Sequence, residues 1–161
     1  KDMLRIYPLS EKKTLVPICA YWSYSTWYTY RTVPFSAVLN EYNRRANLRY
    51  YPYSYIALWD DFPVGMVSLK ESELQRREAN SPWLSALYVA PEFRKRGIGT
   101  NLIKTVIDDC SNKKASKIFL FLDSRNLNNL EQYYTKRGWS FYDSDIDSDG
   151  NRTKILIYKL K

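Results

Sequence analysis

The sequence predicts a mixed α/β fold in a single domain spanning residues 1–161. A chain of 161 residues is long enough for one core and leaves no room for a second domain of ordinary size. Hydrophobic residues make up 45% of the chain and charged residues 26%, a globular composition that excludes collagen-like and strongly disordered classes. Short β-prone runs and segments of helical periodicity follow one another in the order β-α-α-β-β-β-α-β-α-β-β, without an internal repeat or linker.

The first half of the chain is expected to hold three strands and two helices. Ser10 is a suitable N-cap for the first helix, whose apolar residues recur at near-helical spacing in spite of Pro17. The turn at residues 60–63 (Asp-Asp-Phe-Pro) joins two strands as a hairpin, and Gly65 marks a bulge. The expected ranges are 3–9, 55–59 and 64–69 for the strands and 11–22 and 35–45 for the helices.

The second half is expected to hold four strands and two helices. Residues 83–89 are apolar along their whole length, which predicts a strand buried on both faces and ended by Pro91. A capping box formed by Asn128 and Glu131 starts the last helix, and Gly138 stops it. After a polar loop at 70–81, the expected ranges are 83–89, 118–122, 139–142 and 154–160 for the strands and 97–110 and 128–137 for the helices.

The chain is basic, with 25 Lys and Arg residues against 17 Asp and Glu and a formal net charge of +8. Such a charge suits nucleic acid, an anionic membrane surface or a phosphorylated ligand. Because the excess is spread along the chain without a basic tail, no nucleic-acid partner is expected. The chain holds no histidine, which excludes Ser-His-Asp and Cys-His catalysis and zinc sites built on imidazole. A general base must therefore be a carboxylate, Lys, Tyr or water.

Two cysteines, Cys19 and Cys110, lie far apart and form no Cys-x-x-Cys pair. Neither a disulfide framework nor a thiolate metal site is therefore expected, and a reducing compartment is the default. No stretch approaches 18 consecutive apolar residues, and the first residues do not resemble a signal peptide. We expect a cytoplasmic protein without a membrane partner.

The junction between the buried strand and the following helix carries the most informative motif. It reads Pro-Glu-Phe-Arg-Lys-Arg-Gly-Ile-Gly-Thr over residues 91–100. Its two glycines let the backbone turn tightly and approach a ligand closely. The helix that follows directs its unpaired amides and the positive end of its dipole at this loop, and three consecutive cations at 94–96 add charge there. The junction therefore predicts a site for a phosphate or pyrophosphate.

Two familiar phosphate motifs do not fit this junction. A P-loop requires Gly-x-x-x-x-Gly-Lys-[Ser/Thr], which the chain lacks, and a dinucleotide fingerprint requires three glycines after the first strand. A Gly-x-Gly pair taken alone also suits an ordinary glycine-rich turn between a strand and a helix.

The wider context favours the phosphate interpretation. The pattern [Gln/Arg]-x-x-Gly-x-[Gly/Ala], filled by Arg94, Gly97 and Gly99, resembles the acetyl-CoA pyrophosphate loop of the GNAT acetyltransferase superfamily. The stretch PWLSALYVAPEFRKRGIGTNLI is similar to that family's central strand, loop and helix, and LEQYYTKRGWSFY resembles its Leu-Tyr-x-x-x-Gly-[Phe/Trp] segment. The resemblance implies a single GNAT-like domain with a mixed, mostly antiparallel twisted sheet flanked by helices.

The resemblance also implies which residues bind the donor. The strand residues whose backbone would pair with the pantetheine arm are Leu87, Tyr88 and Val89. The loop residues that would hold the pyrophosphate are Arg94, Lys95, Arg96, Gly97, Ile98, Gly99 and Thr100. Family members often place an Asn seven residues before the tyrosine; here that position is Leu127, for which Asn126 or Asn128 can substitute.

The catalytic residues follow partly from the resemblance and partly from chemistry. Tyr134 corresponds to the tyrosine that commonly protonates the departing CoA thiolate, and a phenol with a pKa of about 10 holds its proton at neutral pH. Its alternative role is that of a core aromatic at a helix end. For a general base, the candidates are Glu71 and Glu73, acting through water. They also suit a solvated loop, and no base is needed if the amine arrives neutral.

An aromatic, uncharged run at residues 21–30 (YWSYSTWYTY) is open to two interpretations. One is core packing with an aromatic surface. The other is the wall of an acceptor site, because GNAT proteins commonly form the acceptor pocket between their first two helices; Trp22, Trp27 and Tyr28 are the candidates. Their rings suit a sugar, an aromatic ring or an ammonium group.

The acidic run at 145–150 (Asp-Ile-Asp-Ser-Asp-Gly) imitates the start of an EF-hand loop. Such a loop requires a Glu at its twelfth position, which here is Leu156. The run is therefore expected to form a hairpin turn, and no metal is expected.

The resemblance to the GNAT superfamily implies an acetyl-CoA-dependent N-acetyltransferase that uses acetyl-CoA as co-substrate. The expected partner is an amine acceptor, either a small molecule or a peptide, and the expected state is a monomer or a homodimer. Two alternatives remain open: a catalytically silent acyl-CoA-binding module and a basic nucleic-acid-binding domain.

Overall fold

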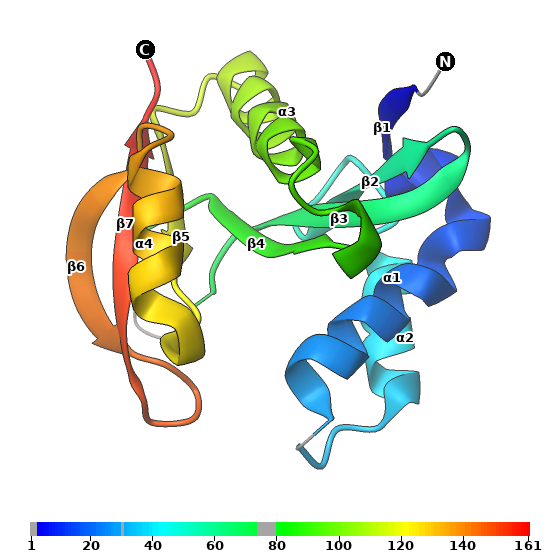
Figure 1. The fold of residues 1–161 in the computed structure, drawn as a ribbon, viewed down its shortest axis with the longest axis horizontal. Coiled ribbons are helices and arrows are strands. Elements are labelled where there is room, and N and C mark those ends of the chain that lie inside the picture. Colours follow the sequence, from blue (N-terminus) through cyan, green and yellow to red (C-terminus); the bar gives the residue numbers. More distant parts are fainter. Residues whose placement is uncertain (1–2, 30, 74–79) are drawn as a thin grey trace. The chain divides into compact units, whose positions relative to one another are not determined.

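A computed structural model describes residues 3–29, 31–73 and 80–161 (Figure 1). Its strands and helices follow the predicted order. The strands are β1 (Leu4–Pro8), β2 (Tyr53–Trp59), β3 (Phe62–Lys70), β4 (Trp83–Val89), β5 (Lys117–Phe121), β6 (Ser140–Ile146) and β7 (Arg152–Lys159). The helices are α1 (Val16–Ser23), α2 (Phe35–Arg44), α3 (Ile98–Asn112) and α4 (Leu127–Thr135).

The sheet confirms the predicted α/β class. Hydrogen-bonded neighbours run in the order β1-β2-β3-β4-β5-β7-β6. The β4–β5 pair is parallel, while β1–β2, β2–β3, β5–β7 and β6–β7 are antiparallel. None of the helices within the described ranges is long and apolar enough to cross a membrane.

The chain divides into two compact units. The first comprises Lys1–Leu69 and Ala86–Val106, and the second comprises Lys70–Ser85 and Ile107–Lys161. Both β4 and α3 contribute residues to each unit. On α3, the buried residues are Ile98, Leu102, Ile103, Val106 and Cys110, while Ile107 is half-buried.

The first unit has one apolar core between its helices and strands. The helices α1 and α2 pack against each other, as Figure 1 shows. Cys19 and Ala20 of α1 and Val38 of α2 join Ile56 of β2 and Met66 of β3 in one buried cluster. Burial of this apolar surface is what fixes both helices on the strands, because α1 is uncharged and α2 is strongly amphipathic.

The start of the first helix differs from the prediction. Two 3-10 turns, Leu9–Glu11 and Lys13–Leu15, replace the expected helix over 11–15, and α1 begins at Val16 without a side-chain cap from Ser10. Pro17 explains the shift, since a residue that lacks an N–H is tolerated in the first turn of a helix and breaks a helix interior.

The β2–β3 hairpin confirms the predicted turn and bulge. Asp60 and Asp61 have φ angles of +49° and +69°, as expected for the two central residues of a tight hairpin turn. The register shifts between Ala57 and Leu58, whose partners on β3 are Gly65 and Pro63. The bulge therefore lies beside Gly65, as the sequence predicts.

The second unit is built around Trp83, Phe119, Ile155 and Ile157. Trp83 pairs with Phe119 across the parallel β4–β5 contact, and their rings lie 5.5 Å apart. The core is thus formed where three strands from distant parts of the chain meet.

The last helix begins differently from the prediction. A 3-10 turn at Ser124–Asn126 precedes α4, and Asp123 accepts a hydrogen bond from the Arg125 amide at its start. Glu131 forms an ion pair with Lys154 of β7 at 2.8 Å. The capping box of Asn128 and Glu131 was therefore the wrong prediction, because a carboxylate within reach of a lysine on another element pairs with it.

The end of α4 and the final hairpin agree with the sequence. Gly138 has a φ of +94°, which ends the helix, and the backbone amide of Trp139 donates to Tyr134. In the β6–β7 turn, Asp147 Oδ1 accepts hydrogen bonds from the amides of Asp149 and Asn151. The acidic run at 145–150 is thus a hairpin turn, as predicted.

Candidate functional site

The strand β4 bends in its middle. Ala86 has a φ of +51°, a left-handed conformation that is rare for a residue other than glycine and concentrates at functional sites. Trp83 and Leu84 are buried, whereas Ser85–Val89 are half-buried. The prediction of a strand buried on both faces is therefore wrong for its second half, which keeps exposed surface because the bend interrupts a regular strand.

The second half of β4 lies close against β3 in the first unit. A Cβ at Gly65 would lie 2.8 Å from the Tyr88 carbonyl oxygen, so no larger residue fits there without a shift. Just beyond the strand, the Ala90 amide donates to the Val64 carbonyl at 2.8 Å. These contacts fix the backbone of Leu87–Val89, the residues for which the family resemblance implies pantetheine binding.

The loop between β4 and α3 contains two left-handed residues. After a 3-10 turn at Pro91–Phe93, Lys95 and Gly97 have φ angles of +64° and +81°. Arg94 Nε donates to the Val89 carbonyl at 2.9 Å, so this side chain braces the loop against β4. Helix α3 begins at Ile98, and the first amides of any helix have no acceptor within the helix itself.

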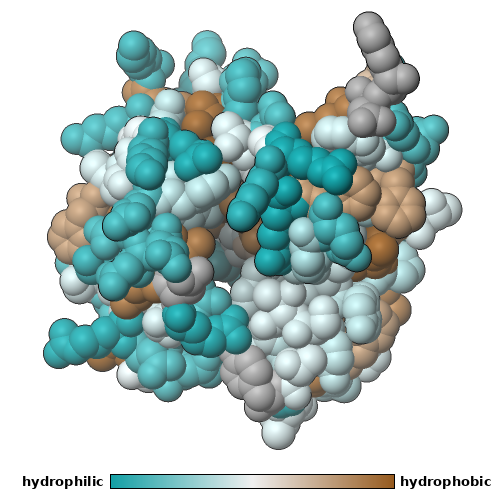
Figure 2. Space-filling view, in the orientation of Figure 1, coloured by the Kyte–Doolittle hydropathy of each residue, from teal (hydrophilic) through white to brown (hydrophobic). Residues whose placement is uncertain are grey.

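The charge and exposure of this loop suit an anion. Arg94, Lys95, Arg96 and Gly97 are exposed, and Figure 2 shows strongly hydrophilic side chains over this part of the first unit. The amides and dipole of α3 add to these cations, because an N-terminal helix end attracts negative charge. The structure therefore brings the predicted loop residues together at one helix end.

The aromatic candidates meet β4 within the first unit. The rings of Trp22 and Tyr88 lie 5.2 Å apart at 30°, and Trp27 and Tyr28 pack against the same apolar cluster. Trp22 is buried while Trp27 and Tyr28 are half-buried. Burial raises the pKa of the Tyr88 phenol, an effect that the charge of Arg94 opposes. Trp22 therefore packs in the core, as the first interpretation of the aromatic run predicts, while Trp27 and Tyr28 keep exposed surface.

The segment after α1 has an unusual conformation. Residues Tyr24–Tyr28 form a π-helix, a form that occurs frequently at functional sites. Figure 2 shows a pale surface of intermediate hydropathy where α1 and this segment lie. Tyr21, which the sequence did not single out, is 59% exposed and lies near enough to Tyr88 to affect its pKa. In the sequence, Tyr21 is one tyrosine in an aromatic run, and only its position on the helix distinguishes it from the other tyrosines there.

A cavity of about 110 Å³ lies beside this segment, against α2. Ser23 and Tyr28 line it from the end of α1 and the segment that follows. Glu41, Tyr42 and Arg45 line it from α2 and the C-terminal end of that helix. The sequence did not predict this cavity, because nothing local indicates which residues of two helices face each other.

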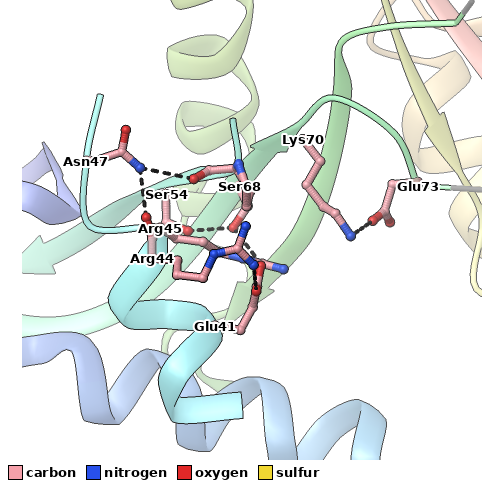
Figure 3. A network of polar contacts seen from close by, with 9 residues as sticks. Glu41, Arg44, Arg45, Asn47, Ser54, Ser68, Lys70 and Glu73 are labelled. Atoms are coloured by element: carbon pink, nitrogen blue, oxygen red, sulfur yellow. Dashed lines mark hydrogen bonds and ion pairs between the residues drawn. The ribbon is translucent and has the colours of Figure 1, made fainter. Parts of the chain in front are cut away.

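A buried polar network at the end of α2 was also missed (Figure 3). Arg45 is 7% exposed; its Nε donates to Glu41 Oε2 at 3.1 Å and its Nη1 to Ser68 Oγ at 3.1 Å. Ser68 Oγ in turn lies 2.6 Å from Ser54 Oγ, and the Arg45 guanidinium lies 4.6 Å from the Tyr42 ring. The network attaches α2 to β2 and β3. The sequence did not indicate it, because an arginine at the end of a helix is ordinarily a solvated residue.

Tyr134 lies in the core of the second unit. It is 6% exposed, and its ring lies 5.2 Å from that of Tyr133 and 5.8 Å from that of Trp139. Burial raises the pKa of its phenol well above the ordinary value, while the nearby charge of Arg137 opposes the shift. The phenol therefore keeps its proton throughout the neutral and moderately alkaline range, as an acid must.

The two candidate bases differ in environment. Glu71 is exposed, whereas the Glu73 side chain is 12% exposed and forms an ion pair with Lys70 Nζ at 2.5 Å, which Figure 3 shows. Both belong to the second unit. Glu71 is therefore accessible to a water molecule, and one carboxylate oxygen of Glu73 is engaged by a cation.

The asparagines expected to replace Leu127 lie at the start of α4. Asn128 is exposed in the first turn of the helix. Asn126 ends the 3-10 turn before it, and its side chain lies outside the described part of the chain. Within residues 3–29, 31–73 and 80–161, no group of three His, Cys, Asp or Glu side chains is arranged to hold a metal ion.

The chain matches the model of one protein family. That family is the acetyltransferase (GNAT) family, and the match covers residues 19–139. No curated protein sequence matches the chain.

Many solved structures share the fold at low sequence identity. An aminoglycoside 6'-N-acetyltransferase complexed with coenzyme A aligns with a TM-score of 0.73 at 14% identity, covering 96% of each chain. The protein yncA from Salmonella typhimurium, solved with its cofactor acetyl-CoA, aligns with a TM-score of 0.70 at 15% identity, covering 100% of this chain and 95% of that one. A chain of the NatC complex bound to Gag peptide and CoA aligns at 0.69 and 15% identity, covering 98% of this chain and 99% of that one.

Proposed function

Because the chain belongs to the acetyltransferase (GNAT) family, we propose that it transfers the acetyl group of acetyl-CoA to a primary amine by direct attack in a ternary complex. The acceptor is a small molecule or a peptide. The observation that carries the proposal is the loop after β4, where two left-handed residues, Lys95 and Gly97, present exposed cations and the amides of α3 to an anion.

The first unit supplies the donor site. The pyrophosphate of acetyl-CoA lies against the residues of the loop and the first turn of α3: Arg94, Lys95, Arg96, Gly97, Ile98, Gly99 and Thr100. The pantetheine arm pairs with the backbone of Leu87–Val89, whose half-buried surface after the bend at Ala86 supports this role. From the second unit, Asn126 and Asn128 are proposed as further donor contacts; Asn128 is exposed at the start of α4.

The transfer requires a nucleophile, a polarised carbonyl and a proton donor. The neutral amine attacks the thioester carbonyl carbon, which a backbone N–H of β4 polarises. The carbon–sulfur bond then breaks, and Tyr134 gives its phenolic proton to the departing thiolate. The attacking nitrogen loses a proton to water, assisted by Glu71 or Glu73. Burial raises the pKa of Tyr134, so its phenol is protonated at neutral pH and holds the proton that this step requires.

The acceptor lies against the aromatic segment after α1. Trp27 and Tyr28 keep exposed surface next to the cluster that holds Trp22 and Tyr88, and aromatic faces suit a sugar ring or an ammonium group. Among the structural relatives, one is an aminoglycoside 6'-N-acetyltransferase and another belongs to the NatC complex bound to a peptide, which is consistent with an amine acceptor.

The setting of the enzyme is part of the same proposal. We place it in the cytoplasm, as a monomer or homodimer with one catalytic domain over residues 1–161 and no metal. Two free, buried cysteines, Cys19 and Cys110, are consistent with a reducing compartment.

A thiol-release assay across an amine panel tests the proposal. The panel holds polyamines, amino sugars, amino acids and peptides with a free N-terminus, each mixed with acetyl-CoA and enzyme. At least one amine is expected to release CoA in equal amount with its acetylated product. Binding of acetyl-CoA without acetylation of any amine would contradict transfer and leave a silent acyl-CoA-binding module. Salt-dependent binding of DNA or RNA that CoA does not displace would contradict the donor site as well.

A further inference from the structure

An aromatic cluster joins the β2–β3 hairpin to the phosphate-binding loop. Trp59 ends β2, Phe62 begins β3, and Phe93 ends the 3-10 turn that leads into the loop. The Phe93 ring lies 6.3 Å from the Trp59 ring and 6.0 Å from the Phe62 ring. We call Trp59, Phe62 and Phe93 the hairpin–loop cluster. It ties an exposed loop to a hairpin whose register is fixed by strand pairing.

Arg96 lies over two rings of this cluster. Its guanidinium carbon is 5.4 Å from the centre of the Trp59 ring and 5.0 Å from that of Phe93. Arg96 itself is exposed, whereas Trp59 and Phe93 are half-buried. The Arg96 cation thus contacts two aromatic rings whose positions are fixed within the first unit.

Contact with a ring leaves the guanidinium able to bind a phosphate. A guanidinium is planar, so an aromatic ring occupies its face, while its N–H donors point outward in the plane. Arg94 is used differently, because its Nε already donates to the Val89 carbonyl. Arg96, by contrast, lies over two rings and is exposed, so its guanidinium remains accessible to an anion.

The loop needs such a restraint. Lys95 and Gly97, on either side of Arg96, both have left-handed φ angles, and both are exposed. An arginine between two such residues would otherwise sample many positions, and ordering it on binding would cost affinity.

We propose that Trp59 and Phe93 are positioning residues for the donor, which hold the Arg96 guanidinium where it meets the pyrophosphate of acetyl-CoA. This inference rests on the proposed function, because it assumes that the loop binds acetyl-CoA. It adds two residues outside the loop motif to the residues that determine donor affinity.

The first experiment compares side chains of the cluster by calorimetric titration of acetyl-CoA and by steady-state kinetics. Trp59→Leu is expected to raise the Kd and the KM for acetyl-CoA about twofold to fivefold, the change that corresponds to one exposed cation–π contact, with kcat unchanged. Trp59→Phe keeps an aromatic face and is expected to restore most of the affinity. Phe62→Leu is the matched control, because the Phe62 ring contacts Phe93 and is 60% exposed; it is expected to change the Kd less than Trp59→Leu.

A double-mutant cycle separates positioning from a general effect on folding. If Trp59 acts through Arg96, Trp59→Leu adds no further loss of affinity in an Arg96→Gln background. The same loss in both backgrounds, or an unchanged Kd for Trp59→Leu in the wild-type background, would overturn the inference while leaving the proposed function standing. Failure of the wild-type protein to bind acetyl-CoA would overturn both.

Discussion

The indole ring of Trp22 lies 5.2 Å from the phenol ring of Tyr88, with 30° between the two planes. This contact joins the end of α1 to the second half of β4 inside one apolar cluster. Two features that are 66 residues apart in sequence, the aromatic run and the strand assigned to the donor, are therefore parts of a single structural unit. Because Trp22 packs against the donor strand, a test of the acceptor wall uses Trp27, which keeps exposed surface, rather than the buried Trp22.

The acceptor wall is tested by Trp27→Leu. Loss of a half-buried indole face from the segment after α1 is expected to raise the KM for the accepted amine several-fold and to leave the KM for acetyl-CoA unchanged, because the loop is not altered. Tyr50→Leu is the control, since Tyr50 is an aromatic residue that is 73% exposed and lies outside this segment. Equal acceptor KM values for Trp27→Leu and wild-type enzyme would exclude the wall.

The acid role is tested by Tyr134→Phe, with Tyr133→Phe as the matched control. Removal of the phenolic proton is expected to lower kcat at least about a hundredfold, the lower range for general acid catalysis, with little effect on acetyl-CoA binding. Burial raises the pKa of Tyr134 above its ordinary value, so the acid stays protonated as pH increases and the rate is expected not to fall between pH 7 and about 10 on its account. Turnover by Tyr134→Phe at the wild-type rate would remove this residue from the mechanism.

The buried thiols predict a loss of stability at high pH. Burial raises the pKa of Cys19 and of Cys110 from 9.0 to about 12, so the unfolded chain loses these protons first as pH increases. Stability is therefore intact below pH 9 and falls above it by about 1.4 kcal/mol per pH unit for each thiol. Urea unfolding of wild type and Cys19→Ala at pH 8, 9.5 and 10.5 measures this slope, which is expected to be shallower in the variant. The same dependence of the unfolding free energy on pH in wild type and Cys19→Ala would show that the Cys19 thiol does not cause the loss of stability.

The network at the end of α2 is tested by Arg45→Met against Arg44→Met. Arg45 is buried and donates to Glu41 and Ser68, so removing its guanidinium is expected to lower the free energy of unfolding by about 1–3 kcal/mol. The Arg44 side chain is 68% exposed and pairs with the same glutamate, so its removal is expected to cost less than about 0.5 kcal/mol. Equal losses in urea unfolding would show that burial of Arg45 is not what matters.

The parts of the structure that depend on neighbouring residues could be predicted from the sequence. The strand, loop and helix over 83–112 follow from an apolar run, two glycines and a 3.6-residue period, all of which act locally. The hairpin turn at Asp60 and Asp61 is equally local, as is the end of α4 at Gly138.

The parts that depend on distant residues could not be predicted. Arg45 is buried because Ser68 and Glu41 meet it in the folded chain, and Glu131 leaves its expected cap because Lys154 of β7 comes within 2.8 Å. Ala86 adopts a left-handed conformation that its own side chain does not favour, so the surrounding strands must impose it. Local signals do not encode such contacts.

Binding of acetyl-CoA at the loop before α3 is tested most directly by one calorimetric titration. Gly97→Val places a β-branched residue at a φ of +81° where no atom lies within 4 Å, so the substitution changes loop conformation without a clash. Gly150→Val is the matched control, with a φ of +82° and equally open space in the β6–β7 turn. The wild-type protein and Gly150→Val are expected to bind one acetyl-CoA with equal affinity, and Gly97→Val at least about tenfold more weakly. Equal affinity of Gly97→Val and wild type, or no binding by the wild type, would contradict the account.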